Sequence, residues 1–398
     1  MAPEETGLDW LEALGPQRIR PGLSRTRALL AGLGDPQGSF RSVLVAGTNG
    51  KGSTAAFASS ILAAAGVRAG LYTSPHLVEV TERVRVGERD VPRRELSDAL
   101  ALVAAVSGAG ALAPTYFEAL TVAAFELFRR RGVTVAVVEV GIGGRLDATN
   151  VLSPEVSAVT NVGLDHLDVL GPTLADVARE KAGVFRPGRP ALTAATGEAL
   201  AVLAEEAARV GARLLTVPPA PADLLAGSAL RGEHQRTNLA LAIAAASAMA
   251  PLGDGAIRDG IASVRWPGRL QRLARPGRRP LLLDGAHNPD GARALAAHLD
   301  AEGLSGRVDL LFGALGDKDV TGTFAPLGAR ARCIALAPPP SPRAVRGDAL
   351  ARLLGRPVSE ACPDVASALD RLDRDGEGLV LVAGSLYLVG EVLRLARA

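Results

Sequence analysis

A glycine-rich segment with a single lysine has the composition of a loop that binds a polyphosphate. It reads GTNGKGST over residues 47–54 and follows an apolar run at 42–46 that predicts a strand. Glycines allow successive backbone N–H groups to face phosphate oxygens, and the N-terminus of a following helix favours an anion. Lys51 would neutralise phosphate charge, and the Ser53 hydroxyl would meet phosphate or Mg²⁺. The segment therefore predicts a nucleotide site, with a glycine-rich turn that binds nothing as the alternative.

Lysine is scarce in this chain. Lys51, Lys181 and Lys318 are the only lysines among 44 basic residues, and all the others are arginine. The remaining lysines are therefore candidates for positions that need a compact or deprotonatable amine. Lys181 ends a predicted helix that begins near Thr173, and its neutral amine could react with CO₂ to give a carbamate, which arginine cannot form. We hypothesise this carbamate, with a salt bridge to Glu180 as the alternative.

A carboxylate interrupts one of the predicted buried strands. Glu139 lies near the end of the run 133–140, where a buried parallel strand should be continuously apolar. Ligands of open α/β sheets bind at the carboxyl ends of the strands, and Mg²⁺ prefers one or two carboxylates there. Glu139 therefore predicts a magnesium site, with an ion pair to an arginine as the alternative. Other polar residues follow neighbouring strands: Ser74 and His76 after 69–72, and Asp165, His166 and Asp168 after 156–160.

Further polar side chains stand at comparable places later in the chain. They are Asn238 in the predicted helix 234–249, Arg269 in a Pro- and Gly-rich segment, Asp284 and His287 after the strand 280–283, and Ser385 before the last helix. The Asn238 amide can donate and accept at once, which suits an adenine edge, with helix capping as the alternative. Arg269 offers a guanidinium to phosphates. Ser385 at a helix N-terminus could receive a carboxylate.

The elements that position these residues follow a regular pattern. Short apolar runs alternate with predicted helices along the chain, which is typical of βαβ units with a parallel sheet. Strands are predicted at 42–46, 69–72, 133–140, 156–160, 191–194, 280–283, 308–312, 333–336 and 378–382, and helices from the glycine-rich loop to about 65, at 200–210, 234–249 and 291–298, and after 385. The Pro-, Gly- and Arg-rich segment 264–277 predicts the domain boundary. We expect an α/β protein with a P-loop-type, mainly parallel ATPase domain at 1–270 and a smaller Rossmann-like domain at 271–398.

Composition excludes several classes of protein. The chain has 398 residues, of which 48% are hydrophobic and 22% charged, so it is not a disordered chain. A net charge of +2 gives no electrostatic case for nucleic acid or an anionic membrane. Two cysteines, Cys333 and Cys362, exclude a disulfide scaffold and fit a reducing compartment. The N-terminus has no apolar signal region, and the longest apolar stretch, 239–252, is too short to span a bilayer. We expect a cytoplasmic protein.

Together these segments resemble the folylpolyglutamate synthase/dihydrofolate synthase family of the Mur ligase superfamily. The matching segments come in one order from near Gly22 to about Leu386: GTNGKGS, YTSPHL, FEALT, EVGIGGRLDATN, TNVGLDH, EKAG, HQRTN, WPGR, LDGAHN, DK and GSL. Each segment alone is weak or moderate, whereas the whole series is specific. The resemblance implies an ATP-dependent amide ligase. ATP would phosphorylate the terminal carboxylate of the substrate, and the α-amine of L-glutamate would attack the acyl phosphate.

The resemblance also implies roles for individual residues. ATP would be bound by Thr48, Asn49, Gly50, Lys51, Gly52, Ser53, Asn238, Arg269 and Asp284, and Mg²⁺ by Ser74, Glu139 and His166. The pterin-bearing substrate would lie near Gly22, Leu23, Ser24, Arg25, Phe117, Glu118, Arg145, Leu146 and Asp147, although an acidic residue is expected at Ser24. Lys51, Lys181 and His287 would be catalytic, with Lys181 matching the carbamylated lysine of the superfamily. His287 and Ser385 would lie where the family handles the incoming glutamate or the reaction centre.

The expected substrates are small molecules: dihydropteroate, reduced folates or both, with L-glutamate, in a monomer. One alternative is another Mur-type ligase acting on a UDP-linked cell-wall acid. It is disfavoured because the glycine-rich loop begins at residue 47, which leaves no evident UDP-binding domain before it. The other alternative is a nucleotide-dependent switch without ligase activity, which glutamate-dependent ADP release would exclude.

Overall fold

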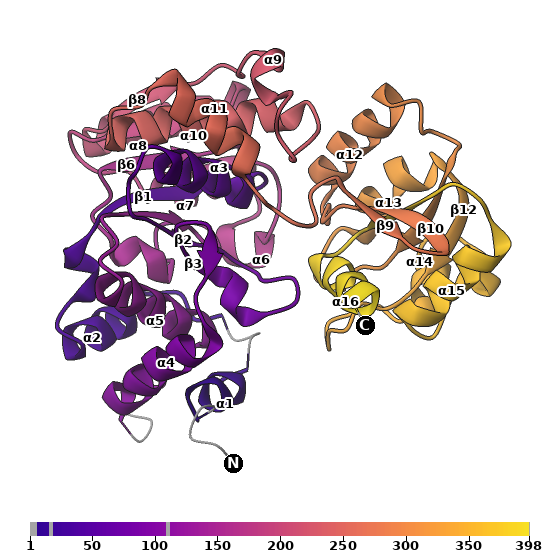
Figure 1. The fold of residues 1–398 in the computed structure, drawn as a ribbon, viewed down its shortest axis with the longest axis horizontal. Helices are drawn as coiled ribbons and strands as arrows, with labels where there is room; N and C mark the ends of the chain where they lie inside the picture. Colours follow the sequence, from indigo (N-terminus) through magenta and orange to yellow (C-terminus); the bar gives the residue numbers. More distant parts are fainter. Residues whose placement is uncertain (1–5, 16–18, 109–111, 398) are drawn as a thin grey trace. The chain divides into compact units, whose positions relative to one another are not determined.

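The structure is a computed structural model, drawn in Figure 1. It describes residues 6–15, 19–108 and 112–397. The chain divides into two compact units. Unit 1 comprises Met1–Ser74, Thr81–Gly227 and Arg236–Val264, and unit 2 comprises Pro75–Val80, Ser228–Gln235 and Arg265–Ala398. Two short segments thus belong to unit 2 although the chain on either side of them does not. The predicted division into 1–270 and 271–398 stays a prediction.

The centre of unit 1 is an eight-stranded sheet in the order β4-β3-β2-β5-β1-β6-β7-β8. Its strands are β1 (Arg41–Ala46), β2 (Ala69–Tyr72), β3 (Val84–Val86), β4 (Arg89–Asp90), β5 (Val135–Glu139), β6 (Val156–Val159), β7 (Pro190–Thr193) and β8 (Arg213–Thr216). Neighbours pair in parallel except at β2–β3 and β3–β4, which are antiparallel. The predicted mainly parallel α/β fold is confirmed.

Helices cover both faces of this sheet. They are α1 (Thr6–Ala13), α2 (Ser24–Gly32), α3 (Lys51–Ala64), α4 (Arg93–Ser107), α5 (Tyr116–Arg130), α6 (Leu167–Leu170), α7 (Leu174–Ala182), α8 (Gly197–Val210), α9 (Ala222–Leu225), α10 (His234–Met249) and α11 (Asp254–Ser263), with short 3₁₀ turns η1 (Pro36–Ser39), η2 (Val80–Arg83) and η3 (Ala148–Val151). Figure 1 shows α3, α10 and α11 on one face and α2, α4 and α5 on the other. Central strands buried on both faces are expected to be continuously apolar. β1 is apolar from Val43 to Ala46, and β5 is apolar until its last residue, Glu139.

Small residues let α3 lie between the sheet and α11. The helix begins with KGSTAAFASS, and every residue from Gly52 to Ser59 is buried. A Cβ on Gly260 of α11 would lie 2.5 Å from Ile61 Cα, so only glycine permits this approach of the two helices. Ser60 Oγ also donates a hydrogen bond to Gly260 O at 2.8 Å. This packing fixes the helix whose N-terminus follows the glycine-rich loop.

Unit 2 has a five-stranded sheet in the order β12-β11-β13-β10-β9. Its strands are β9 (Gln271–Arg275), β10 (Arg278–Leu283), β11 (Val308–Phe312), β12 (Ala331–Leu336) and β13 (Leu379–Ala383), and its helices are α12 (Pro289–Ala301), α13 (Val320–Gly328), α14 (Gly347–Leu353), α15 (Val365–Asp375) and α16 (Leu386–Arg397), with η4 at Val358–Glu360. All strands pair in parallel except β9, which is antiparallel to β10. β9 lies inside the segment 264–277, for which the sequence predicts a domain boundary but no strand. The strand could not be recognised because its half-buried sequence, QRLAR, lacks an apolar run.

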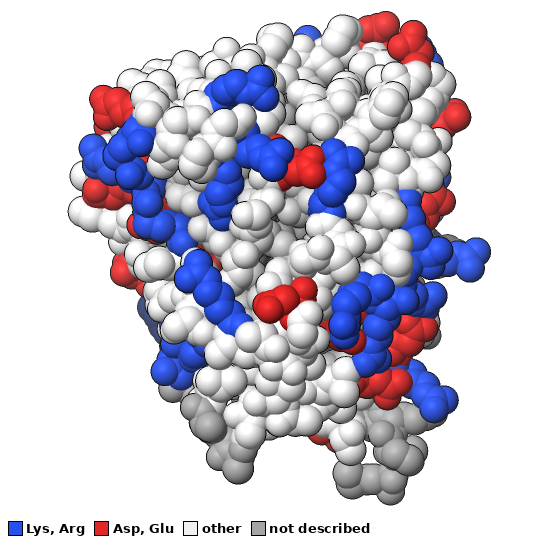
Figure 2. Space-filling model, turned by 90° about the vertical axis from the view of Figure 1, so that its left-hand side faces the viewer, with Lys and Arg blue, Asp and Glu red and all other residues white. Residues whose placement is uncertain are grey.

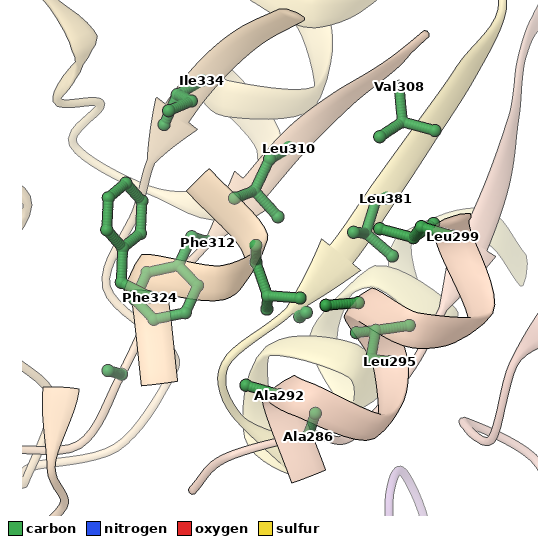
Figure 3. Close-up of a cluster of buried hydrophobic side chains, with 14 of the residues drawn as sticks. Ala286, Ala292, Leu295, Leu299, Val308, Leu310, Phe312, Phe324, Ile334 and Leu381 are labelled. Carbon is green, nitrogen blue, oxygen red and sulfur yellow. The ribbon is translucent and has the colours of Figure 1, made fainter. Parts of the chain in front are cut away.

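The strands of unit 2 divide their side chains between two cores, because successive residues of a strand point to opposite faces. Leu310, Phe312 and Leu381 pack with α12 and α13 on one face (Figure 3). Leu311 and Val382 pack with α15 and α16 on the other face. β11 and β13 therefore contribute to both layers, which explains why their stretches 310–312 and 379–383 are continuously apolar.

The surface mixes both signs of charge. On the face drawn in Figure 2, basic and acidic side chains lie beside one another around wide uncharged areas. Many form ion pairs, such as Arg41 with Glu155 at 2.6 Å. Within the described ranges, no helix combines the length and apolar character needed to cross a membrane. Cys333 and Cys362 are free thiols.

Candidate functional site

The glycine-rich loop connects β1 to α3. Gly47 and Gly50 have φ of 145° and 82°, a backbone region that other residues rarely adopt. A Cβ on Gly47 would overlap Thr160 Oγ1, so glycine is required there for close approach as well. α3 begins at Lys51 directly after this turn, and Lys51 Nζ donates to Thr48 O at 3.2 Å. The loop therefore has the strand–turn–helix context that a phosphate-binding loop needs.

The segment after β6 holds this loop in place. Asn49 N donates to Asn161 Oδ1 at 2.9 Å, and Thr160 Oγ1 donates to Asn49 O at 2.6 Å. Gly163 N donates to Thr48 Oγ1 at 2.9 Å. These partners were not assigned a role from the sequence, although their position after a neighbouring parallel strand was a usable signal. They fix the backbone that would contact phosphate.

Asn238 also lies against the loop. It is buried on α10, and a Cβ on Gly50 would collide with its Oδ1. The predicted adenine-contacting amide and the predicted phosphate loop are thus neighbours within unit 1. Gly52 and Ser53, in the first turn of α3, are buried as well.

Lys181 brings its amine to the same loop. Its Nζ donates to Gly47 O at 2.9 Å, and the residue is 3% exposed. Burial, and then the positive charge of Lys51, lower the pKa of Lys181 to about 7, while Asp165 acts in the opposite direction. A neutral amine is the form that reacts with CO₂, so the environment suits the carbamate hypothesis.

The lowered pKa predicts how stability depends on pH. Lys181 has an ordinary pKa of 10.5 and a native pKa of about 7. Between these values the unfolded chain binds more protons than the native chain, so the free energy of unfolding rises with pH. In Lys181→Met this contribution is absent. Denaturant unfolding in CO₂-free buffer should show the wild type gaining stability relative to Lys181→Met from pH 7.5 to 9.5; parallel curves would contradict the buried amine.

Ser74 and Glu139 meet at the carboxyl ends of neighbouring strands. β2 and β5 pair in parallel, and Ser74 N donates to Glu139 Oε2 at 3.0 Å. Glu139 is 4% exposed. His166 follows β6 with a strained φ of 54° and donates from its backbone N to Asp165 Oδ1. Carboxylate and hydroxyl oxygens suit Mg²⁺, and phosphate oxygens and water complete most Mg²⁺ sites, whereas an imidazole ligand is more typical of transition metals. Among the described side chains no cluster of three His, Cys, Asp or Glu is arranged for a metal; the predicted set includes a serine.

Three segments predicted to bind the pterin substrate converge in unit 1. Gly22 N donates to Leu146 O at 3.2 Å. Arg25 and Glu118 form a salt bridge at 2.9 Å, and Glu118 also forms a capping box with Thr115 at the start of α5. Leu23 precedes α2, and the exposed Ser24 begins it. Segments about a hundred residues apart in the sequence thus lie together.

Phe117 and Asp147 both face Gly141. A Cβ on Gly141 would lie 2.7 Å from the Phe117 ring and 3.0 Å from Asp147 Oδ2. Asp147 is buried, which raises its pKa, while hydrogen bonds from Thr149 and Ile142 oppose the rise. Leu146 beside it is 47% exposed. A half-polar, half-apolar wall of this kind suits a heteroaromatic ligand.

The guanidinium of Arg145 binds other groups of the protein. Its Nη2 donates to Arg179 O at 3.0 Å and to Glu206 Oε2 at 3.3 Å, and its Nε lies 3.7 Å from Glu180 Oε1. The guanidinium thus joins the loop to α7 and α8. Its role in binding substrate stays a prediction.

Unit 2 has its own group of predicted residues. β10 and β13 pair in parallel, and Gly384 N donates to Ala286 O at 2.8 Å, which brings the loops after the two strands together. Asp284 accepts from Leu270 N and Ala286 N, both at 2.9 Å. The remaining members are Arg269, whose Nη1 donates to Gly268 O, His287, whose Nδ1 donates to Gly285 O at 2.8 Å, and buried Ser385, whose Oγ accepts from Tyr387 N.

Known proteins resemble the chain over nearly its whole length. Residues 45–242 match the Mur ligase middle domain, and residues 268–386 match the Mur ligase glutamate ligase domain. The Escherichia coli dihydrofolate synthase/folylpolyglutamate synthase is 36% identical, covering 100% of this chain and 96% of that protein. The chain spans about half the length of two longer curated relatives, probable bifunctional folylpolyglutamate synthase/dihydropteroate synthases of Haloferax volcanii and Halobacterium salinarum, with 48% and 50% of their lengths covered.

Solved structures of the same family are similar to this chain over nearly its whole length. E. coli FolC in complex with DHPP and ADP has a TM-score of 0.85 at 34% identity and covers 99% of both chains. The Yersinia pestis bifunctional folylpolyglutamate synthase/dihydrofolate synthase complexed with AMPPNP and Mn has a TM-score of 0.84 at 34% identity, covering 100% and 99%. The sequence resemblance is confirmed, and the chain belongs to the folylpolyglutamate synthase/dihydrofolate synthase family of the Mur ligases.

Proposed function

We propose that this chain is an ATP-dependent amide ligase that adds L-glutamate to dihydropteroate, to reduced folates, or to both. The observation that carries the proposal is a convergence in unit 1. One sheet edge holds the glycine-rich loop with Lys51 and Lys181, and the segments that pair as Gly22–Leu146 and Arg25–Glu118 lie together in the same unit. Family membership supplies the reaction class.

The proposed reaction has two steps. An oxygen of the acceptor carboxylate attacks the γ-phosphorus of ATP, the bond to the β-phosphate oxygen breaks, and ADP leaves. The neutral α-amine of glutamate then attacks the acyl carbon, phosphate leaves, and the amine loses a proton as the amide forms. Because phosphoryl transfer depends on positioning and charge neutralisation, Lys51 and the loop N–H groups would hold the phosphates. Asn238 would contact the nucleotide base.

Lys181 would act as a carbamate. Its lowered pKa of about 7 leaves much of the amine neutral at physiological pH. The Nζ lone pair would attack CO₂ and release one proton, giving a carboxylate beside the loop. Such a group would hold a divalent cation, which the Lys181 ammonium would repel.

Ser74, Glu139 and His166 would hold Mg²⁺, which when bound neutralises phosphate charge. We expect Glu139→Ala to raise the Mg²⁺ concentration needed for half-maximal activity by at least about tenfold. Since the Ser74 N–H also loses its acceptor, Glu139→Gln is the better-matched variant, because it keeps an oxygen for that hydrogen bond. Titrating Mg²⁺ against ADP release measures the effect, and an unchanged titration would remove Glu139 from the metal site.

The predicted residues of unit 2 would bind ATP and glutamate. Arg269 and Asp284 would contact ATP, and His287 and Ser385 would bind the incoming glutamate. The Ser385 position before α16 suits a carboxylate, because the helix N-terminus favours negative charge. The monomeric state and cytoplasmic location stay predictions.

The two alternatives are not favoured. The full-length similarity is to folate ligases, which leaves a UDP-linked cell-wall acid without support. A switch without ligase activity leaves the convergence of Gly22, Glu118 and Asp147 unexplained.

Mass spectrometry of the product tests the proposal. The pure protein is incubated with Mg-ATP, L-glutamate and either dihydropteroate or tetrahydrofolate. A product heavier than the acceptor by one glutamyl residue is expected with at least one acceptor. Unchanged acceptor in both reactions would refute the proposed function.

A further inference from the structure

We propose that Asn150 is a positioning residue that locks the predicted substrate loop to the end of the helix carrying Lys181. The inference rests on the proposed function of those two elements. Asn150 lies in η3 and is 6% exposed. Its Nδ2 donates to Arg145 O at 3.0 Å and to Gly183 O at 3.1 Å. One amide group therefore bridges the residue that begins Arg145–Asp147 and the residue two positions after Lys181.

A half-buried guanidinium sets the orientation of this amide. Arg186 Nη2 donates to Asn150 Oδ1 at 2.7 Å, and the same guanidinium donates to Gly183 O at 3.2 Å and Leu152 O at 2.9 Å. Because a guanidinium only donates, Oδ1 must face Arg186 and Nδ2 must face the two carbonyls. Both donors and the acceptor of the Asn150 side chain are thus used, and no other residue type of this size supplies that set.

The two backbones that Asn150 joins have almost no freedom to separate or approach. A Cβ on Gly144 would lie 2.8 Å from Glu180 O and 2.9 Å from Lys181 O, and a Cβ on Gly183 would overlap Arg145. Arg145 N also donates to Glu180 O at 3.0 Å. Loop and helix end therefore move together, so a displacement at Asn150 reaches both Asp147 and Lys181.

Asn150→Asp separates positioning from folding. Aspartate keeps the shape and gains an ion pair with Arg186, which preserves the folded chain, but it cannot donate to Arg145 O and Gly183 O and places a negative oxygen against them. We expect KM for the acceptor to rise about tenfold and kcat to fall at least about tenfold, with KM for ATP unchanged, because small misplacements near the reacting groups are costly. A loss of folded protein alone would lower kcat and leave every KM unchanged.

Asp364→Asn is the matched control. Asp364 is exposed before α15 and accepts from Ser367 N at 2.8 Å, a bond that asparagine keeps. Wild-type kinetics are expected for this variant. Wild-type kinetics of Asn150→Asp, or a fall in kcat with no rise in acceptor KM, would overturn the inference.

Hydrogen exchange tests the same inference without turnover. Asn150→Asp should accelerate amide exchange in 143–150 and 181–186 together, while 47–54 stays protected as in the wild type. Faster exchange in one segment only, or in neither, would overturn the coupling. A wild-type enzyme inactive with both acceptors would instead refute the proposed function, and the exchange result would still decide the role of Asn150.

Discussion

Lys181→Arg is expected to lose at least about 99% of ligase activity although the positive charge is kept. Arginine stays protonated at any physiological pH and cannot form a carbamate. Its larger guanidinium would also replace an amine that donates to Gly47 O at 2.9 Å in a buried position next to Lys51. Loss of one preorganised charged group near the transferred phosphoryl commonly costs about 100-fold or more in kcat. ADP release at saturating ATP, glutamate and acceptor measures the effect.

The control exchanges the same residue types in reverse on the same helix. Arg179 lies on α7 with its side chain half exposed, in an ion pair with Asp176 at 3.5 Å. Arg179→Lys should retain wild-type activity within about twofold, because such exposed pairs contribute little. Bicarbonate should stimulate CO₂-depleted wild type and leave Lys181→Arg unchanged. Full activity of Lys181→Arg would mean that the lysine is only a hydrogen-bond or ion-pair partner.

Lys51→Ala is expected to abolish ATP turnover, with residual kcat below about 1% of wild type. The variant removes the one lysine of the loop, whose charge would neutralise the migrating phosphoryl group. Burial is the main cause of the lowered pKa of Lys181 and the charge of Lys51 is the second, so removing that charge should raise this pKa part of the way toward its ordinary value. Less of the Lys181 amine would then be neutral and able to form the carbamate. Two losses in one site explain the large expected effect.

Lys51→Arg separates these two losses. It keeps the charge beside Lys181 and alters the side-chain contacts with phosphate and with Thr48 O, so its activity should exceed that of Lys51→Ala. Calorimetric titration with ATP reports binding, and ADP release reports turnover. Wild-type turnover in Lys51→Ala would refute the assignment of residues 47–54 as the phosphate-binding loop.

The sequence located the strand ends that position the site. The run Ser42–Ala46, the glycines after it, and Glu139 at the end of β5 were predictable, because parallel strands place their carboxyl ends at one edge of a sheet. Parallel pairing of β1 with β5 and β6 is what brings Lys51 and Glu139 to that edge. Local patterns sufficed here because each functional residue lies at the end of its strand or just beyond the loop that follows it.

Long-range partners were not predictable from the sequence. Nothing near Arg145 indicates that the guanidinium of this loop residue binds Glu206 on α8, and nothing near Asn49 indicates that Asn161 accepts its N–H. Segment Pro75–Val80 packs with unit 2 because Leu77 and Val78 contact its core. The apolar residues Leu77, Val78 and Val80 in an otherwise polar loop were the only local signal. Such contacts depend on the folded topology rather than on spacing.

ADP release with different acceptors tests the central claim most directly. The pure protein receives Mg-ATP and L-glutamate with dihydropteroate, with tetrahydrofolate, or with no acceptor, and each reaction is repeated without glutamate. The account predicts ADP release that requires both glutamate and at least one folate acceptor; release with both acceptors would make the enzyme bifunctional. Two results would contradict the folate-ligase account: ATP binding without ADP release with either acceptor, or ADP release at the same rate with and without glutamate.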